Sequence, residues 1–380
     1  GLNRERRRNN TDAYRITGRE YMDKERGRID MKRRFALALA VVMLAALCLS
    51  GCGGSAQTGE DSQSSSSAGG ETTGSGNWPN DSTIRLICGF SAGGSSDLMC
   101  RIFAEALGKE LGQTVVVENL PGSGGHVSWN EVVHNTEPDG YTICVINSPG
   151  ICICKEQAEN PRDYNHTDFD LLGNHVSDYG TVCWKTDETR WSDFNSLIEY
   201  AKEHELLYGT SQMNIGGDDY AFAEMMNAAF GTKFSAVITE GSKDNEVLLL
   251  NGSCDLLIGN IGDTLVGDQG GTFKIGAVAA PERVTDLIPD VPTVKELTGQ
   301  EIVSFSARGY ATAPGTDPAI LEKLRQATEA AITNPDTIEQ MNAMGCVTNF
   351  VTAEDDSYLN YMNDVRKLYL DIFGIEMIPD

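Results

Sequence analysis

Short apolar runs alternate with longer periodic segments along the chain from about residue 82 onward. The runs over 83–90, 114–120 and 140–147 have the length and the β-branched content of buried strands. Between the first two runs, the segment 97–111 places apolar side chains on one helical face. This order predicts an α/β fold with a largely parallel sheet.

A second series of runs follows and predicts a second α/β lobe. The expected strands lie over 170–176, 180–186, 206–210, 234–239, 254–260 and 274–280. Helices are expected over 192–204, capped by Ser192, and over 218–230. The stretch 260–270 carries three glycines and predicts a loop.

The C-terminal part returns to long helical patterns. Asp317 can cap a helix whose first turn holds Pro318, and the pair Asn334-Pro335 predicts its end. A closing helix is expected over about 353–373.

The N-terminal region has the pattern of an export signal. A basic start at residues 31–34 precedes about fifteen mostly apolar residues, too few to span a bilayer. The segment ends in Leu-Ser-Gly-Cys, which resembles the lipobox of bacterial lipoproteins, so we expect a signal peptide over 31–52 and lipid anchoring through Cys52. The alternative is a short membrane helix with an accidental cysteine.

Two further segments flank this signal. Residues 1–30 are polar and place the signal far inside the chain, so we interpret them as a non-native upstream extension. Residues 53–79 are rich in Gly, Ser and Thr and predict a disordered linker.

The charge excludes one class of partner. The first 51 residues hold 12 Lys and Arg and 6 Asp and Glu, which leaves 18 basic and 49 acidic side chains and a formal charge of −31. Such an acidic chain is not expected to bind nucleic acid. It can still bind a small anion, since exposed charges are screened beyond about 8–10 Å.

Eight cysteines follow Cys52. Those in or beside apolar runs predict buried thiols, although an exported protein could also pair some of them. No spacing fits a metal site, and no Walker or dinucleotide-binding loop occurs, so we predict neither metal nor cofactor.

The turn "GFSAGGSSD" at 89–97 contains the G-x-S-x-G pattern of a serine hydrolase, which would make Ser91 a nucleophile. That mechanism needs a later acid and histidine, yet no histidine follows His204, which lies in a polar helical segment. Of the five histidines only His126 could approach a ligand. We therefore predict no catalytic residue, and keep the hydrolase as the weaker alternative.

This turn and "PGSGGHVS" at 121–128 share a different chemistry. In each, a strand ends, glycines let the backbone approach a ligand, and the next helix presents unpaired N–H groups. Four or five charge-assisted hydrogen bonds of about 1.5–3 kcal/mol would supply the roughly 8 kcal/mol of micromolar binding. The two turns predict a carboxylate site.

The stretch "IRLICGFSAGGSSDLMCRIFAEALGKELGQTVVVENLPGSGGHVSWNEVVHNTEPDGYTI" resembles the start of the substrate-binding proteins of tripartite tricarboxylate transporters, the TctC or Bug family. Further blocks, among them "DLIPDVPTVKELTG" and "GYATAPGTDPAILEKLRQA", resemble that family in the same order. The resemblance implies a type 2 periplasmic-binding fold with the ligand in the cleft between two lobes. Lobe one would hold 80–180 plus 305–380, and lobe two 181–304.

The resemblance also implies which residues bind the ligand. From lobe one these are Phe90, Ser91, Ala92, Gly93, Gly94, Ser95, Ser96, Asp97, Ser123, Gly124, Gly125, Asn147 and Ser148, and from lobe two Thr210, Ser211, Gly216, Gly217 and Glu240. Asp97 is expected to cap its helix rather than touch ligand. At 237–242 the family's frequent aromatic-Lys pair is replaced by Thr239 and Glu240. Glu240 would receive an ammonium group if it faced the cleft, and would have no role if it faced water.

The expected function is that of an extracytoplasmic solute-binding protein. It would be a monomer that captures a small carboxylate (a di- or tricarboxylate, an amino acid or an aromatic acid) and delivers it to the membrane permease subunits. The alternative in another class is a sensor that binds the same ligand and docks on a receptor.

Overall fold

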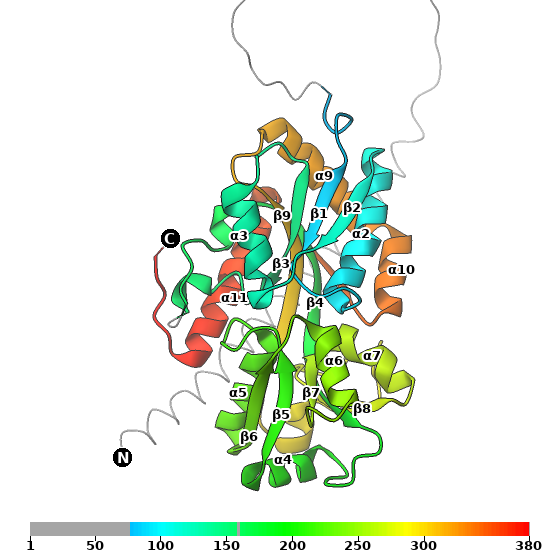
Figure 1. Cartoon of the computed structure of the whole chain (residues 1–380), viewed down its shortest axis with the longest axis vertical. Helices are drawn as coiled ribbons and strands as arrows, with labels where there is room; N and C mark the ends of the chain where they lie inside the picture. Colours follow the sequence, from blue (N-terminus) through cyan, green and yellow to red (C-terminus); the bar gives the residue numbers. More distant parts are fainter. Residues whose placement is uncertain (1–76, 158–159, 380) are drawn as a thin grey trace, which may run out of the picture.

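A single long strand, β4 (Asp170–Lys185), ties the two halves of the protein together in the computed structural model, which describes residues 77–157 and 160–379. Its residues 170–179 pair with β9, and its residues 180–185 pair with β7 and β8. Figure 1 shows the two lobes one above the other, with β4 between them. The sequence predicted two separate strands here. We propose that the lobes divide near Gly180 and again near Ser304.

The first lobe combines six strands with helices on both sides. Its strands and helices are β1 (Ile84–Cys88), α2 (Ser95–Leu111), β2 (Val115–Asn119), α3 (His126–Asn135), β3 (Thr142–Ser148), the first part of β4, β9 (Phe305–Thr312), α9 (Pro318–Thr333), α10 (Pro335–Ala343), β10 (Thr348–Thr352) and α11 (Ser357–Phe373). Short 3-10 turns occupy Ser123–Gly125, Cys154–Glu156, His166–Asp168 and Glu354–Asp356.

The second lobe is smaller. Besides the last part of β4 it holds α4 (Phe194–Glu203), β5 (Glu205–Thr210), α5 (Asp218–Phe230), β6 (Lys233–Ile238), α6 (Ser242–Leu250), β7 (Leu257–Asn260), α7 (Ile261–Gln269), β8 (Phe273–Val278) and α8 (Val294–Thr298).

The predicted α/β class is confirmed, but the prediction of a largely parallel sheet is wrong. The main sheet has the order β10-β4-β9-β3-β1-β2, and only β1 pairs in parallel, with β2 and β3. β9 runs antiparallel to both β3 and β4, and β10 runs antiparallel to β4. The chain passes between the lobes within β4 and again just before β9. Because these two strands run antiparallel to their neighbours, the sheet is mixed.

Both faces of this sheet are buried. Ile84 and Leu86 of β1 pack with Phe103 of α2, whereas Ile87 points into the core on the opposite face. Alternate strand residues point to opposite faces, so a strand covered on both sides reads as a continuous apolar run. Because β1 and β3 are parallel, their carboxyl ends meet at one edge of the sheet, which faces the second lobe (Figure 1).

Residues 261–269 form helix α7, which corrects the predicted loop over 260–270. Asn260 and Asp263 form a reciprocal capping box that starts the helix. Its glycines serve close packing: a Cβ at Gly262 would collide with Cys346 and lie 2.9 Å from Asp178 Oδ2, and one at Gly267 would collide with Phe273. Glycine here allows helix contact rather than a turn.

Other local predictions have mixed outcomes. Asp317 caps α9, with its carboxylate accepting from the amides of Ala319 and Ile320. By contrast α4 is capped by Asp193 rather than by Ser192. The eight cysteines from Cys88 to Cys346 are all buried and free, as the main interpretation predicted.

Several N-terminal predictions lie outside the described residues, namely the upstream extension over 1–30, the signal peptide over 31–52 with Cys52, and the linker as far as residue 76. Trp78, near the end of the predicted linker, is buried against Tyr141, so the folded part begins earlier than residue 80. Among residues 77–157 and 160–379 there is no helix with both the length and the apolar character needed to cross a membrane.

Candidate functional site

The turn between β1 and α2 touches the other lobe directly. The Ser91 amide donates to the Glu240 carbonyl oxygen over 3.3 Å, and a Cβ on Gly94 would lie 2.7 Å from Ser242 Oγ. Reciprocally, a Cβ on Gly241 would lie 2.6 Å from Ser91 Oγ. The two segments, each from a different lobe, thus approach as closely as glycine allows.

Several backbone donors of this turn already have acceptors, which corrects the expectation of unpaired amides. Ser91 donates to Glu240, Gly93 donates to Asp97 Oδ2 over 2.8 Å, and Ser95 donates to Asp263 Oδ1 over 3.3 Å. The Asp263 carboxylate thus lies at the N-terminus of α2, where the helix dipole favours a negative charge.

The residues of this turn differ in their exposure and in their hydrogen-bond partners. Ser91 Oγ is buried and has no hydrogen-bond partner in the described part of the chain. Ser96 is buried at the start of α2, whereas Ala92 and Gly93 are exposed. Phe90 is partly buried, and its carbonyl oxygen accepts from the Asn119 side chain. Ser91 Oγ is therefore a buried polar atom whose hydrogen bonding is unsatisfied in the described part of the chain.

Asp97 holds the turn in shape. Besides the Gly93 amide, its carboxylate accepts from Asn119 Nδ2 and from the Arg101 guanidinium. Burial acts to raise the pKa of Asp97, but these hydrogen bonds bring it below its ordinary value. Its oxygens are engaged within lobe one, so it positions the turn rather than offering donors to an anion. The expectation that Asp97 caps α2 is wrong: the helix begins after Gly94 without a side-chain cap, and Asp97 lies in its first turn.

The second glycine turn faces lobe two through Gln212. Gly124 has a φ of 65°, and a Cβ there would lie 2.7 Å from Gln212 Oε1. Ser123 is exposed, and its Oγ accepts from Arg162, while the Gly125 amide donates back to Gly122. This turn is a contact between lobes, and glycine is required there by both φ and space.

His126 follows that turn and lies at the same contact. Its ring nitrogens lie 3.1 Å from Tyr164 Oη and 3.4 Å from Gln212 Nε2. Burial lowers the pKa of His126 to about 3, so the ring is neutral near pH 7. It supplies a polar, uncharged group to the lobe interface.

The segment after β3 forms a third contact. Asn147 Oδ1 is buried without a hydrogen-bond partner among the described residues, whereas Ser148 Oγ lies 3.2 Å from Cys152 Sγ. Farther along, Gln157 accepts from Asn214 Nδ2 over 3.4 Å, and a Cβ on Gly216 would lie 2.7 Å from Gln157 Nε2.

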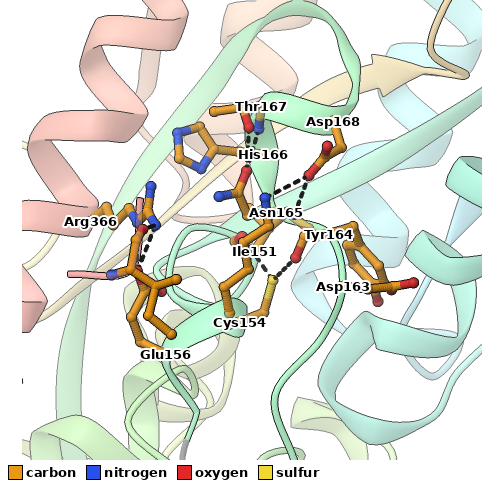
Figure 2. Close-up of polar contacts among 12 residues, drawn as sticks. Ile151, Cys154, Glu156, Asp163, Tyr164, Asn165, His166, Thr167, Asp168 and Arg366 are labelled. Carbon is orange, nitrogen blue, oxygen red and sulfur yellow. Dashed lines mark hydrogen bonds and ion pairs between the residues drawn. The ribbon is translucent and has the colours of Figure 1, made fainter. Parts of the chain in front are cut away.

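A buried ion pair anchors this segment. Arg366 of α11 donates to Glu156 Oε1 over 2.6 Å, and both side chains are buried. Figure 2 shows this pair and also Cys154, which belongs to the same 3-10 turn as Glu156 and whose sulfur donates to the carbonyl oxygens of Ile151 and Tyr164. Arg366 thus fixes the residues next to Gln157.

The lobe-two residues predicted from "LLYGT" lie at the end of β5. Thr210 Oγ1 lies within 3.3 Å of the backbone of Gln212, and Ser211 is partly buried. Gly217 precedes α5, and a Cβ there would lie 2.7 Å from the Gln212 carbonyl oxygen. These residues meet lobe one through Gln212 itself, which the sequence prediction omitted.

The side chain of Glu240 is exposed. Within the described part of the chain, its contact with the other lobe is through the backbone carbonyl oxygen, which accepts from Ser91. This placement favours the alternative in which the Glu240 carboxylate faces water.

A charged group at the lobe interface was missed from the sequence. Arg308 of β9 is buried beside Asp178 of β4, and its Nη2 donates to Asn260 Oδ1 of lobe two over 2.7 Å. One signal could have indicated it, because Arg308 is the one charged residue within the strand "FSARGYAT". A lone charge in a buried strand requires a partner.

Comparisons with known proteins identify the family and the fold of this chain. A family model described as the tripartite tricarboxylate transporter family receptor matches residues 99–367. The chain belongs to this receptor family. Its two lobes are those of the type 2 periplasmic-binding fold, as predicted.

Several relatives of this receptor family are similar along most of their length. A UPF0065 protein of Cupriavidus necator is 30% identical over 270 residues, covering 68% of this chain and 77% of the relative. BugT of Bordetella pertussis (strain Tohama I) is 25% identical over 271 residues, covering 71% and 82%.

Solved structures show the same fold. The periplasmic binding protein BugD has a TM-score of 0.68 at 24% identity, covering 77% of this chain and 95% of BugD. A Rhodopseudomonas palustris protein solved with adipate has a TM-score of 0.71 at 22% identity, covering 80% and 100%. MatC of the same species, solved with malate, has a TM-score of 0.66 at 21% identity, covering 77% and 97%. Family and fold are those of substrate-binding proteins.

Proposed function

We propose that this receptor-family protein captures a small carboxylate between its lobes and delivers it to a tripartite tricarboxylate-type permease outside the cytoplasm. The proposal rests mainly on one observation: the two lobes contact each other at the turns that the family resemblance implies as ligand-binding segments. Turn 90–94 contacts 240–242, Gly124 contacts Gln212, and Gln157 contacts Asn214 and Gly216. The malate and adipate found with two structural relatives support a carboxylate ligand.

In this mechanism lobe closure converts ligand capture into a shape that a partner can recognise. The ligand would bind at the edge formed by β1 and β3, where Ser91 Oγ and Asn147 Oδ1 are buried without partners in the described residues. A ligand that contacts both lobes favours the closed arrangement by its differential affinity for that arrangement. Lipid anchoring through Cys52 would keep the protein at the membrane.

A panel of small acids tests the proposal. Each mono-, di- or tricarboxylate, aromatic acid and amino acid is paired with the neutral amide of the same skeleton, and binding is measured by thermal shift and calorimetry. At least one acid should bind with a dissociation constant in the micromolar range or below, and its amide at least 100-fold more weakly. Equal binding of acid and amide by every pair would contradict carboxylate recognition.

Ser91 should act as a ligand contact and not as a nucleophile. Its Oγ has no hydrogen-bonded base in the described part of the chain, and a serine needs such a base to attack. Replacing Ser91 with alanine should weaken the bound acid by about 10- to 150-fold, the worth of one hydrogen bond to a charged group. Turnover of ester substrates that disappears in Ser91→Ala would support the hydrolase instead.

A further inference from the structure

Four aspartates gather around one buried arginine where the two lobes meet. Asp178 of the crossing strand β4 and Arg308 of β9 are each 2% exposed, and Arg308 Nη1 lies 3.6 Å from Asp178 Oδ2. Asp218 and Asp219 lie in the first turn of α5, and Asp263 lies in the first turn of α7. These three lobe-two carboxyl groups also interact electrostatically with Arg308. One guanidinium therefore faces four carboxyl groups that come from both lobes.

Two of the carboxyl groups accept hydrogen bonds across the lobe boundary. The Gly262 amide of lobe two donates to Asp178 Oδ2 over 3.1 Å. The Ser95 amide of lobe one donates to Asp263 Oδ1 over 3.3 Å. Separation of the lobes would break both hydrogen bonds and admit water to the cluster. The surroundings of these carboxyl groups therefore depend on whether the lobes touch.

The other groups that face Asp178 have a fixed charge near pH 7. Cys346 lies between α10 and β10, and its thiol donates to Asp178 Oδ2 over 3.7 Å. Burial raises the pKa of Cys346 well above its ordinary value, so the thiol is neutral. Burial acts to lower the pKa of Arg308, but the surrounding carboxylates bring it above its ordinary value, so the guanidinium stays charged. In residues 77–157 and 160–379, no group of three or more His, Cys, Asp or Glu side chains could hold a metal ion. Protonation of the aspartates is therefore the step that can change the charge of this cluster.

Burial makes these carboxyl groups easier to protonate. It raises the pKa of Asp178 to about 7, although Arg308 opposes the shift. Burial raises the pKa values of Asp218 and Asp219 in the same way. An aspartate in water has a pKa of about 3.9. Protonation of Asp178 therefore favours the arrangement in which the lobes touch. This contribution is fully present below pH of about 4 and is lost as the pH rises through about 7.

We propose that the four aspartates form a proton-sensitive latch between the lobes. While they are neutral, they lie together at the lobe boundary and the lobes stay in contact. When they ionise, repulsion among the carboxylates and the cost of keeping them out of water favour separation of the lobes. A captured solute would be held in mild acid and released more readily as the pH rises. The latch goes beyond the proposed function, because it acts on the lobes with or without a ligand.

His126 acts in the opposite direction and has to be separated from the latch. Its burial at the lobe contact lowers its pKa to about 3, whereas the pKa of an exposed histidine is about 6.5. Protonation of His126 in acid therefore favours open lobes. Comparing an Asp178 variant with the original protein at each pH removes this contribution, since both proteins carry His126.

Asp178→Asn tests whether this group titrates as the latch requires. Asparagine keeps an acceptor for the Gly262 amide but cannot ionise. Equilibrium urea unfolding of ligand-free, dialysed protein compares the variant with the original between pH 5.5 and pH 8.0. The unfolding constant of the original, divided by that of the variant, should rise about 30-fold over this range, because the original alone must ionise Asp178 in the folded state. A ratio that does not change with pH would overturn the latch.

Small-angle scattering on the same ligand-free samples tests whether the titration moves the lobes. The radius of gyration of the original protein should increase from pH 5.5 to pH 8.0, and that of Asp178→Asn should increase less. Equal radii for the two proteins at both pH values would overturn the latch, even where the unfolding ratio changes. Neither measurement uses a ligand, so a negative result leaves the proposed carboxylate capture standing.

Two further variants complete the test. Asp219→Asn removes another carboxyl group of the cluster and should change the unfolding ratio and the radius in the same direction as Asp178→Asn. It decides the matter if Asp178→Asn does not fold. Asp187→Asn, at an exposed lobe-two carboxylate, is the matched control and should behave as the original protein at both pH values. An equal response of Asp187→Asn and the cluster variants would mean that overall charge, rather than the cluster, sets the pH dependence.

Discussion

Replacing Arg366 with methionine should lower the free energy of unfolding by about 3–5 kcal/mol, because it leaves the buried Glu156 carboxylate without its partner. The change also removes the hydrogen bond from Arg366 to the Ile378 carbonyl oxygen, which ties the C-terminal residues to the same segment. Since Gln157 follows Glu156 and contacts Asn214, affinity for the ligand should fall as well. Urea unfolding and calorimetry measure the two effects.

A double variant tests whether charge is the cause. Adding Glu156→Gln to Arg366→Met should recover most of the lost stability, since glutamine keeps an acceptor for the Ile378 amide without a buried charge. The neighbouring Lys367 pairs with Asp371 on the surface, so Lys367→Ala should cost less than about 1 kcal/mol. A double variant no more stable than Arg366→Met alone would contradict this explanation.

Gly241→Val should weaken ligand binding at least 100-fold while leaving the unfolding midpoint within a few degrees of the original. A Cβ at this position would lie 2.6 Å from Ser91 Oγ and 3.2 Å from the Ser91 amide nitrogen, so valine holds the lobes apart. The residue itself has an extended φ of 161°, so the collision is the main cost. Calorimetry gives the affinity, and small-angle scattering in the presence of ligand should show a more open molecule.

Lys243→Val is the matched control for that change. It adds a β-branched side chain two residues away, on an exposed position whose ion pair is with Glu246. Its affinity should stay within about threefold of the original protein. Undiminished binding by Gly241→Val would mean that the contact between 240–242 and Ser91 has no part in ligand capture.

The pattern of apolar runs predicted most elements because buried strands and amphipathic helices have distinct periods. It failed at α7, where Gly262 and Gly267 were read as loop residues. Their reason is tertiary: Cys346 and Phe273 occupy the space of their side chains. Sequence periodicity carries no information on such distant neighbours, and the error also hid Asp263.

The candidate site was predicted unevenly for a related reason. Glycine turns are local signals, so segments 90–94 and 123–125 were found, and both lie at the lobe contact. Their partners lie more than 80 residues away in the sequence. The Glu240 carbonyl oxygen accepts from the Ser91 amide, and the Gln212 side chain lies against Gly124. Arg308 has a local signal, a lone charge in an apolar strand, but its partners Asp178 and Asn260 are again distant.

Hydrogen exchange with and without the tightest acid of the panel tests the central claim most directly, because it maps where both lobes respond to ligand. Binding between the lobes predicts slower exchange in 89–96 and 122–126 of lobe one and, together with these, in 210–217 and 240–243 of lobe two. Protection confined to one lobe, or found only on surfaces away from these segments while calorimetry shows binding, would contradict capture between the lobes.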